Sequence, residues 1–213
     1  STVLTGGAAA AAVHAPSAVV LPEGGVAVYF EVGDGGSIDL ATGPVGGSLS
    51  RQGTVLSQSD VHDPPEDQRA GAQFWVDIEA LRSPQALLTA GPDGRPSLRV
   101  WFAGWGRESG DSYQFGEIIP IPPNYSIGYA AALDPSSPGE LIPWSFNPVL
   151  DRVQVFLEHR SELTPAVVQV TDADGTPRGG YLMYYLDAIA DAARGPVQPG
   201  RIGVAGNGDF QVD

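Results

Sequence analysis

The chain has 213 residues, with 25 acidic and 11 basic side chains, a formal net charge of −14 and no cysteine. Every basic residue is an arginine, and the arginines are scattered singly between Arg51 and Arg201. Wrapping a nucleic acid or docking on an anionic membrane needs clustered positive charge, so the charge distribution argues against both functions. The absence of cysteine also excludes a disulfide framework, a thiolate zinc site and an iron–sulfur cluster.

Glycine and proline are abundant, at 28 and 19 residues, while 42% of the chain is hydrophobic. This composition supports a mainly aliphatic core connected by many turns. No stretch approaches the roughly 18 apolar residues that a membrane span requires. We detect no internal repeat and no linker long enough to divide the chain, and therefore expect one domain.

Residues 1–17 are predicted to form a flexible N-terminal arm, followed by a single β-sandwich domain over residues 18–213. Gly6-Gly7, the alanine run Ala8–Ala12 and Pro16 offer little surface to bury. The Ser1 start is consistent with removal of an initiator Met or with cleavage of a leader, and we favour the first. An arm of this kind could become ordered on a neighbouring subunit.

Period-two alternation of apolar side chains predicts β-strands through most of the remaining chain. Val26, Val28, Phe30 and Val32 share one face of the first strand. Turn sequences such as Asn207-Gly208 separate the candidates. The predicted strands are Val26–Val32, Ser37–Ala41, Thr54–Gln58, Gln73–Ile78, Ser97–Ala103, Tyr113–Ile121, Tyr125–Ala132, Arg152–Glu158, Ala166–Thr171, Arg201–Ala205 and Asp209–Val212.

Two segments have helical spacing instead. In Tyr181–Arg194, apolar residues recur every three or four positions until Gly195-Pro196, which predicts a late helix. A shorter helix is an alternative at Ile78–Leu88, although Pro84 interrupts it. The predicted fold is thus an all-β, two-sheet sandwich with one late helix. We prefer the jelly-roll type because the loops Arg51–Ala72 and Ala132–Pro148 are long.

An acidic segment is the sharpest polar cluster and the candidate metal site. Carboxylate oxygens and an imidazole could bind Ca²⁺ or another divalent ion, but the spacing does not match an EF-hand. A solvated acidic loop is the simpler interpretation, so no cofactor is required. The candidate metal ligands are Asp60, His62, Asp63, Glu66 and Asp67.

Other catalytic signals are sparse. Asp172-Ala173-Asp174-Gly175 is better explained as a hairpin turn than as a calcium loop. The three histidines, His14, His62 and His159, belong to no recognisable nucleophile motif. Paired carboxylates such as Asp77 and Glu79, or Glu117, leave a β-sandwich hydrolase as a third hypothesis.

Aromatic residues are the candidate contacts to a ligand or another subunit. Exposed, they would form a sugar-stacking platform or a protein–protein hot spot; buried, Trp101 is simply part of the core. Core or intersubunit contact is the preferred interpretation over sugar binding. The candidate contact residues are Trp101, Trp105, Trp144 and Phe146.

The run Gly116–Tyr129 has the pattern of a strand, a proline-led turn and a returning strand. Together with the small-residue arm, it resembles single-jelly-roll virion shell proteins, either coat or decoration subunits. The resemblance covers the pattern of roughly residues 18–212 and transfers no site residue. It implies a non-enzymatic building block that packs edge to edge in a symmetric shell.

We therefore expect a structural assembly protein of a virus or phage particle, located in the virion. Its partners would be other copies of itself and other particle proteins, without nucleic-acid binding or membrane insertion. The alternative is an extracellular carbohydrate-binding or adhesin-like module, with calcium dependence left open.

Overall fold

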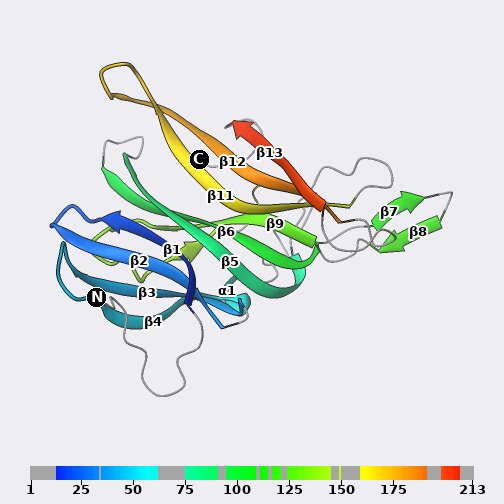
Figure 1. Cartoon of the computed structure of the whole chain (residues 1–213), viewed down its shortest axis with the longest axis horizontal. Coiled ribbons are helices and arrows are strands. Elements are labelled where there is room, and N and C mark those ends of the chain that lie inside the picture. Colours follow the sequence, from blue (N-terminus) through cyan, green and yellow to red (C-terminus); the bar gives the residue numbers. More distant parts are fainter. Residues whose placement is uncertain are drawn as a thin grey trace.

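The computed structural model describes residues 13–33, 35–61, 75–90, 95–108, 111–114, 117–120, 124–144, 149, 159–190 and 198–206. These residues form three successive antiparallel sheets, a separate two-stranded ribbon and one short helix. The third sheet lies at the top of Figure 1, the second in the middle and the first at the lower left. Over the described ranges, no helix has the length and apolar character to cross a membrane.

The first sheet contains strands β1 to β4 in chain order, each paired with the next. Its turns use glycine where the backbone needs a positive φ, as at Gly24 (φ 85°) between β1 and β2. Helix α1 (Gln58–Val61) directly follows the last strand of this sheet. The strands are β1 (Val13–Val20), β2 (Gly25–Val32), β3 (Ser37–Pro44) and β4 (Ser50–Ser57).

The second sheet has the strand order β10-β9-β6-β5, and the third has the order β11-β12-β13. The ribbon β7–β8 is inserted between β6 and β9 and extends to the right in Figure 1. The remaining strands are β5 (Trp75–Ala90), β6 (Pro96–Glu108), β7 (Asp111–Gln114), β8 (Glu117–Pro120), β9 (Asn124–Ala132), β10 (Ile142–Pro143), β11 (His159–Thr171), β12 (Pro177–Ala190) and β13 (Gln198–Gly206).

The second sheet buries side chains on both of its faces. One face, with Val100 and Phe102, joins Tyr29 and Leu40 of the first sheet in a common core. The opposite face, with Trp101, Ile127 and Tyr129, packs with Tyr181 and Met183 of the third sheet. The three sheets therefore stack in chain order, and burial of apolar surface holds neighbouring layers together.

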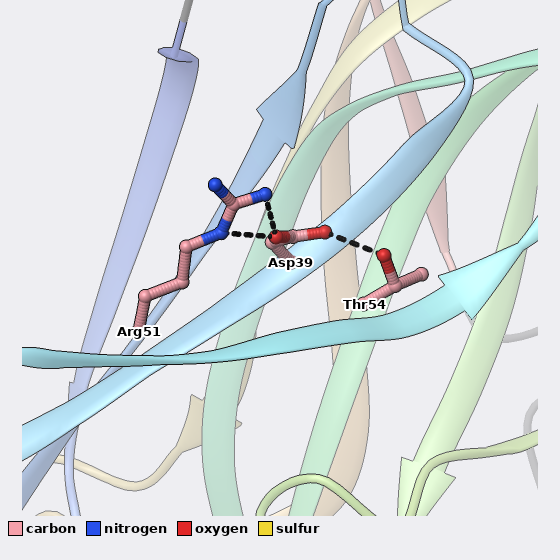
Figure 2. A network of polar contacts seen from close by, with 3 residues as sticks. All are labelled: Asp39, Arg51 and Thr54. Carbon is pink, nitrogen blue, oxygen red and sulfur yellow. Dashed lines mark hydrogen bonds and ion pairs between the residues drawn. The ribbon is translucent and has the colours of Figure 1, made fainter. Parts of the chain in front are cut away.

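A buried carboxylate lies within the first sheet, and Figure 2 shows its partners. Asp39 is about 99% buried at its side chain, and Arg51, whose side chain is 51% exposed, pairs with it. Arg51 Nε donates to Asp39 Oδ2 at 2.6 Å, and Thr54 Oγ1 donates to Oδ1 at 2.9 Å. Because both carboxylate oxygens have partners, the charge is tolerated away from water. This network links β3 to β4.

The three sheets are structural repeats, because each begins with a strand that contains the same irregularity. Two residues bulge out of register in β1, β5 and β11, and the second is always a proline. The first has a positive φ each time: Ala15 at 45°, Ser83 at 48° and Thr164 at 53°. These are the three non-glycine residues with positive φ in the described part of the chain.

The register of the following strands confirms the repeat independently. Counting from the bulge, Glu31, Ala103 and Leu186 occupy equivalent positions on the second strand of each sheet. Their partners on the next strand are all isoleucines, Ile38, Ile127 and Ile202. Around these isoleucines the sequences are similar: Ser37-Ile38-Asp39-Leu40-Ala41, Ser126-Ile127-Gly128-Tyr129-Ala130 and Arg201-Ile202-Gly203-Val204-Ala205. The expectation of no internal repeat is therefore wrong.

The all-β prediction is confirmed, and the antiparallel sheets pack in a sandwich-like arrangement. The preferred jelly-roll connectivity is corrected, because strands adjacent in the sequence pair within one sheet, apart from the inserted ribbon. The predicted arm is wrong for residues 13–17, which belong to β1; residues 1–12 lie outside the described ranges. The predicted strands Arg152–Glu158 and Asp209–Val212 also lie outside them.

Both predicted helices are strands. The segment Tyr181–Arg194 largely forms β12, which pairs with β11 and β13. Because one face of β12 is buried and the other also has large apolar residues, such as Leu182 and Tyr184, its spacing imitates a helix. The segment Ile78–Leu88 lies in β5, whose edge position and bulge accommodate Pro84.

We predict that Leu40→Ala lowers the free energy of unfolding by about 2–5 kcal/mol, because Leu40 is 2% exposed in the core between the first two sheets. Leu133→Ala is the matched control, since Leu133 is 77% exposed and its loss should cost less than about 0.5 kcal/mol. Urea denaturation measures both. Equal losses would contradict the packing described above.

Candidate functional site

A hollow of about 450 Å³ opens where the first and second sheets meet. It lies at the start of β1, the end of β2, the bulge of β5 and the start of β9. Its volume falls within the range of about 300–1,000 Å³ typical of small-molecule sites. The residues that line it are His14, Ala15, Glu31, Gly33, Arg82, Ser83 and Tyr125.

Two of the three proline bulges contribute directly to this hollow. Ala15 and Ser83, both with positive φ, lie in its lining, together with Gly33 at φ 64°. An L-residue in this backbone region is strained, and strain of this kind concentrates at binding and catalytic sites. The surrounding sheets hold the strained residues in place.

Glu31 is the buried carboxylate of the site, at 6% exposure. Its Oε2 atom accepts a hydrogen bond from the backbone N–H of Ser83 at 3.1 Å. Nearby, the hydroxyl of Ser17 accepts from the N–H of Ala86 at 2.9 Å, and the carbonyl of Gly35 accepts from the N–H of Leu81. The first sheet thereby provides acceptors for the outer edge of β5, which pairs with no further strand of its own sheet among the described residues.

Gly35 positions Arg82. A Cβ atom at Gly35 would lie 2.8 Å from Arg82 Nε, closer than real Cβ contacts, and 3.0 Å from its Cγ, which is tighter than most of them. Gly35 also has a φ of 91°, which strongly favours glycine. The absence of a side chain thus allows the arginine to pass against the turn between β2 and β3 and reach the hollow.

Tyr125 supplies the aromatic surface. Its ring packs against that of Trp105 on β6, with ring centroids 4.9 Å apart and an angle of 50° between the planes. Trp105 and Tyr125 are directly paired across the two strands. An aromatic neighbour at this distance fixes the orientation of the tyrosine ring.

Two residues that line the hollow, Glu31 and Tyr125, differ in kind from the residues at the equivalent positions of the other two repeats. Glu31 corresponds to Ala103 and Leu186 in the other sheets. Tyr125, two residues before the shared isoleucine, corresponds to Gly36 and Gly200. A polar or aromatic residue where the scaffold elsewhere has an apolar residue or glycine indicates a role beyond packing.

The predicted metal site is not assembled in the described part of the chain. Asp60 lies in α1, and its Oδ2 accepts from the backbone N–H of Ser57 at 2.7 Å and from its hydroxyl at 2.6 Å. Asp60 thus caps the start of α1 by accepting from Ser57, which explains this carboxylate structurally. His62, Asp63, Glu66 and Asp67 lie outside the described ranges. Among described residues, no three His, Asp or Glu side chains gather in a metal-binding group.

The predicted aromatic contacts have different environments. Trp101 is fully buried between the second and third sheets, so its assignment as a surface contact is corrected to a core residue. Trp105 is half-buried beside Tyr125, next to the hollow. Trp144 packs at the edge of the core between the second and third sheets, with its ring centroid 6.4 Å from that of Tyr129. Phe146 lies outside the described ranges.

Among the other polar candidates whose side chains the structure describes, Asp172, Asp174 and Glu79 do not line the hollow. Asp172–Gly175 forms the expected hairpin turn, in which the N–H of Thr176 donates to Asp174 and lowers the pKa of that carboxyl. Glu79 is exposed and falls between the paired residues Ile78 and Ala80, where the register of β5 shifts. The sequence analysis therefore missed Glu31, Arg82 and Tyr125, the residues that the fold brings together.

No protein-family model matches the sequence, and no curated protein matches it. Three solved structures resemble the fold. A thermostable family-43 glycoside hydrolase matches with a TM-score of 0.48 and 13% identity over 83% of this chain and 42% of its own. A candidate glycoside hydrolase from Parabacteroides distasonis matches with a TM-score of 0.48 and 15% identity, over 85% and 48%. An exo-inulinase from Aspergillus awamori matches with a TM-score of 0.49 and 12% identity, over 92% and 37%.

The chain thus spans less than half the length of each matched protein. At 12–15% identity, the likeness concerns the fold alone. The matched structures are described as glycoside hydrolases and an inulinase, and none of the three as a virion or capsid protein. The predictions of viral function and of no enzymatic activity are corrected accordingly.

We predict that Ser83→Gly is more stable than Ser83→Val by about 1–2 kcal/mol, because glycine accepts the positive φ that a β-branched residue resists. Ser50, exposed on β4, is the matched control, and there valine should be the more stable of the two. Urea denaturation of the four variants measures the order. The same order at both positions would contradict a strained backbone at Ser83.

Proposed function

We propose that this chain binds carbohydrate in the hollow between the first and second sheets. The observation that carries the proposal is the convergence there of Glu31, Arg82, His14 and Tyr125. This combination offers acceptors, donors and an aromatic face within one small volume. Each is a group that sugar recognition uses.

The polar groups match the hydroxyl groups of a sugar. Every hydroxyl both donates and accepts, so a sugar site needs both kinds of partner. The Glu31 carboxylate accepts, the Arg82 guanidinium donates, and an imidazole such as that of His14 can do both. A few convergent polar groups in a concave site fix the orientation of a small ligand.

The aromatic group matches the apolar face that a sugar ring presents through its C–H groups. Tyr125 offers a ring face and a hydroxyl together, an amphipathic surface suited to a ligand that is apolar on its faces and polar at its edge. Trp105 behind Tyr125 pre-organises that ring, which lowers the entropy lost on binding.

Charge argues for a neutral ligand rather than a phosphate in this hollow. Glu31 faces the same space as Arg82, and the chain as a whole carries a net charge of −14. The described lining supplies one carboxylate, Glu31, whereas glycosidic cleavage ordinarily uses two. The proposal therefore concerns binding of the sugar.

We predict that Tyr125→Ala weakens sugar binding at least about tenfold, since loss of a stacking ring and of its buried area amounts to roughly 1.4 kcal/mol. Isothermal titration calorimetry against neutral oligosaccharides of glucose, xylose, arabinose, mannose, galactose and fructose measures the affinity. Glu31→Gln, which retains an acceptor for Ser83, should weaken binding without unfolding the sheet edge.

Tyr184→Ala is the control, because Tyr184 is 42% exposed on the far face of the third sheet. Its affinity should equal that of the unmodified chain. No detectable heat with any of these sugars would contradict the proposal, as would equal losses in the Tyr125 and Tyr184 variants.

A further inference from the structure

Arg99 is a buried cation at a position where the other two repeats have apolar residues. It lies on β6 with 6% exposure, and its equivalents are Ala27 in the first sheet and Leu182 in the third. Its neighbour Trp101 is fully buried and equivalent to Tyr29 and Tyr184. Burying a charge without an opposite charge is costly, so this departure from the repeat needs a physical reason.

Aromatic rings surround the guanidinium. Arg99 Cζ lies 5.1 Å from the ring centroid of Tyr181 and 5.8 Å from that of Tyr129, and Tyr129 is also hydrogen-bonded to Arg99. Burial raises the pKa of Tyr129 to about 12, so its phenol stays protonated at neutral pH. The rings attract the cation but do not neutralise it.

Several N–H groups in this layer have no acceptor. Nε and Nη1 of Arg99 and Nε1 of Trp101 are buried without hydrogen-bond partners among the described residues. The Trp101 ring lies 5.3 Å from that of Tyr129 and 5.7 Å from that of Tyr181, so both residues share one aromatic layer. By contrast, the equivalent Tyr29 donates its hydroxyl to the carbonyl of Pro138 at 2.6 Å.

We propose that Arg99 and Trp101 form a binding site for the carboxylate of a small soluble acid, between the second and third sheets. A water molecule would satisfy the N–H groups, whereas a carboxylate oxygen also offsets the buried positive charge. The aromatic rings would enclose the body of the acid. Arg99 pairs with Ala131, at the opposite end of β6 and β9 from Trp105 and Tyr125, so this site is separate from the hollow.

The test is thermal unfolding of the full chain in sodium acetate, sodium glucuronate or sodium chloride at equal ionic strength, with glucose as a neutral probe. Acetate and glucuronate should raise Tm in a saturable manner, by about 3–6 °C at ten times their Kd. Chloride should not reproduce this shift, and a glucose shift that arises in the hollow should persist in Arg99→Met. Arg99→Met, which keeps the stem but removes every donor, should abolish the acetate shift.

Trp101→Phe keeps an aromatic ring but removes the indole N–H, and should weaken acetate binding severalfold; it also tests the site if Arg99→Met does not fold. Arg95→Met, at an exposed arginine just before β6, should keep the full shift. The proposal is wrong if neither acid raises Tm beyond chloride. It is equally wrong if the acetate shift persists in Arg99→Met.

Discussion

Burial of both faces of the second sheet is the interaction on which the described structure depends. Side chains of β6 alternate between the two layers: Val100 and Phe102 enter the core with the first sheet, while Trp101 enters the core with the third. Because each core needs both of its sheets, neither outer sheet is independent of the middle one. On the far face of the third sheet, Val168, Leu182 and Tyr184 stay exposed. The equivalents of Leu182 and Tyr184 in the first two sheets are buried.

The candidate site is a consequence of how the repeats begin. A proline cannot donate a hydrogen bond to a strand ladder, so each sheet starts with a bulge in its edge strand. The backbone N–H groups of Ser83 and Ala86 on the edge of β5 find their acceptors in the first sheet. One of these acceptors is the carboxylate of Glu31, which also lines the hollow. The same group therefore closes a sheet edge and provides the chemistry of the site.

The sequence predicted the strands well where apolar side chains alternate along the chain or a turn signal is strong, as in β2 and in the Asp172–Gly175 hairpin. It failed at β12, where apolar residues on both faces remove the period-two signal. The site was missed because Glu31, Arg82 and Tyr125 are distant in sequence and meet through sheet stacking. The internal repeat could have revealed the site, because the three sheets share a proline in the bulge of the first strand and an isoleucine in the third strand. Insertions such as β7–β8 hide this repeat in the sequence.

The central claim is that a sugar occupies the hollow between the first and second sheets. Backbone amide NMR of the uniformly labelled chain, titrated with the neutral oligosaccharide that binds in calorimetry, tests it most directly. The account predicts saturable shifts concentrated at Glu31, Gly33, Ser83 and Tyr125. Shifts concentrated instead at Val168 and Leu182 on the third sheet would contradict it, as would the absence of saturable shifts at the hollow.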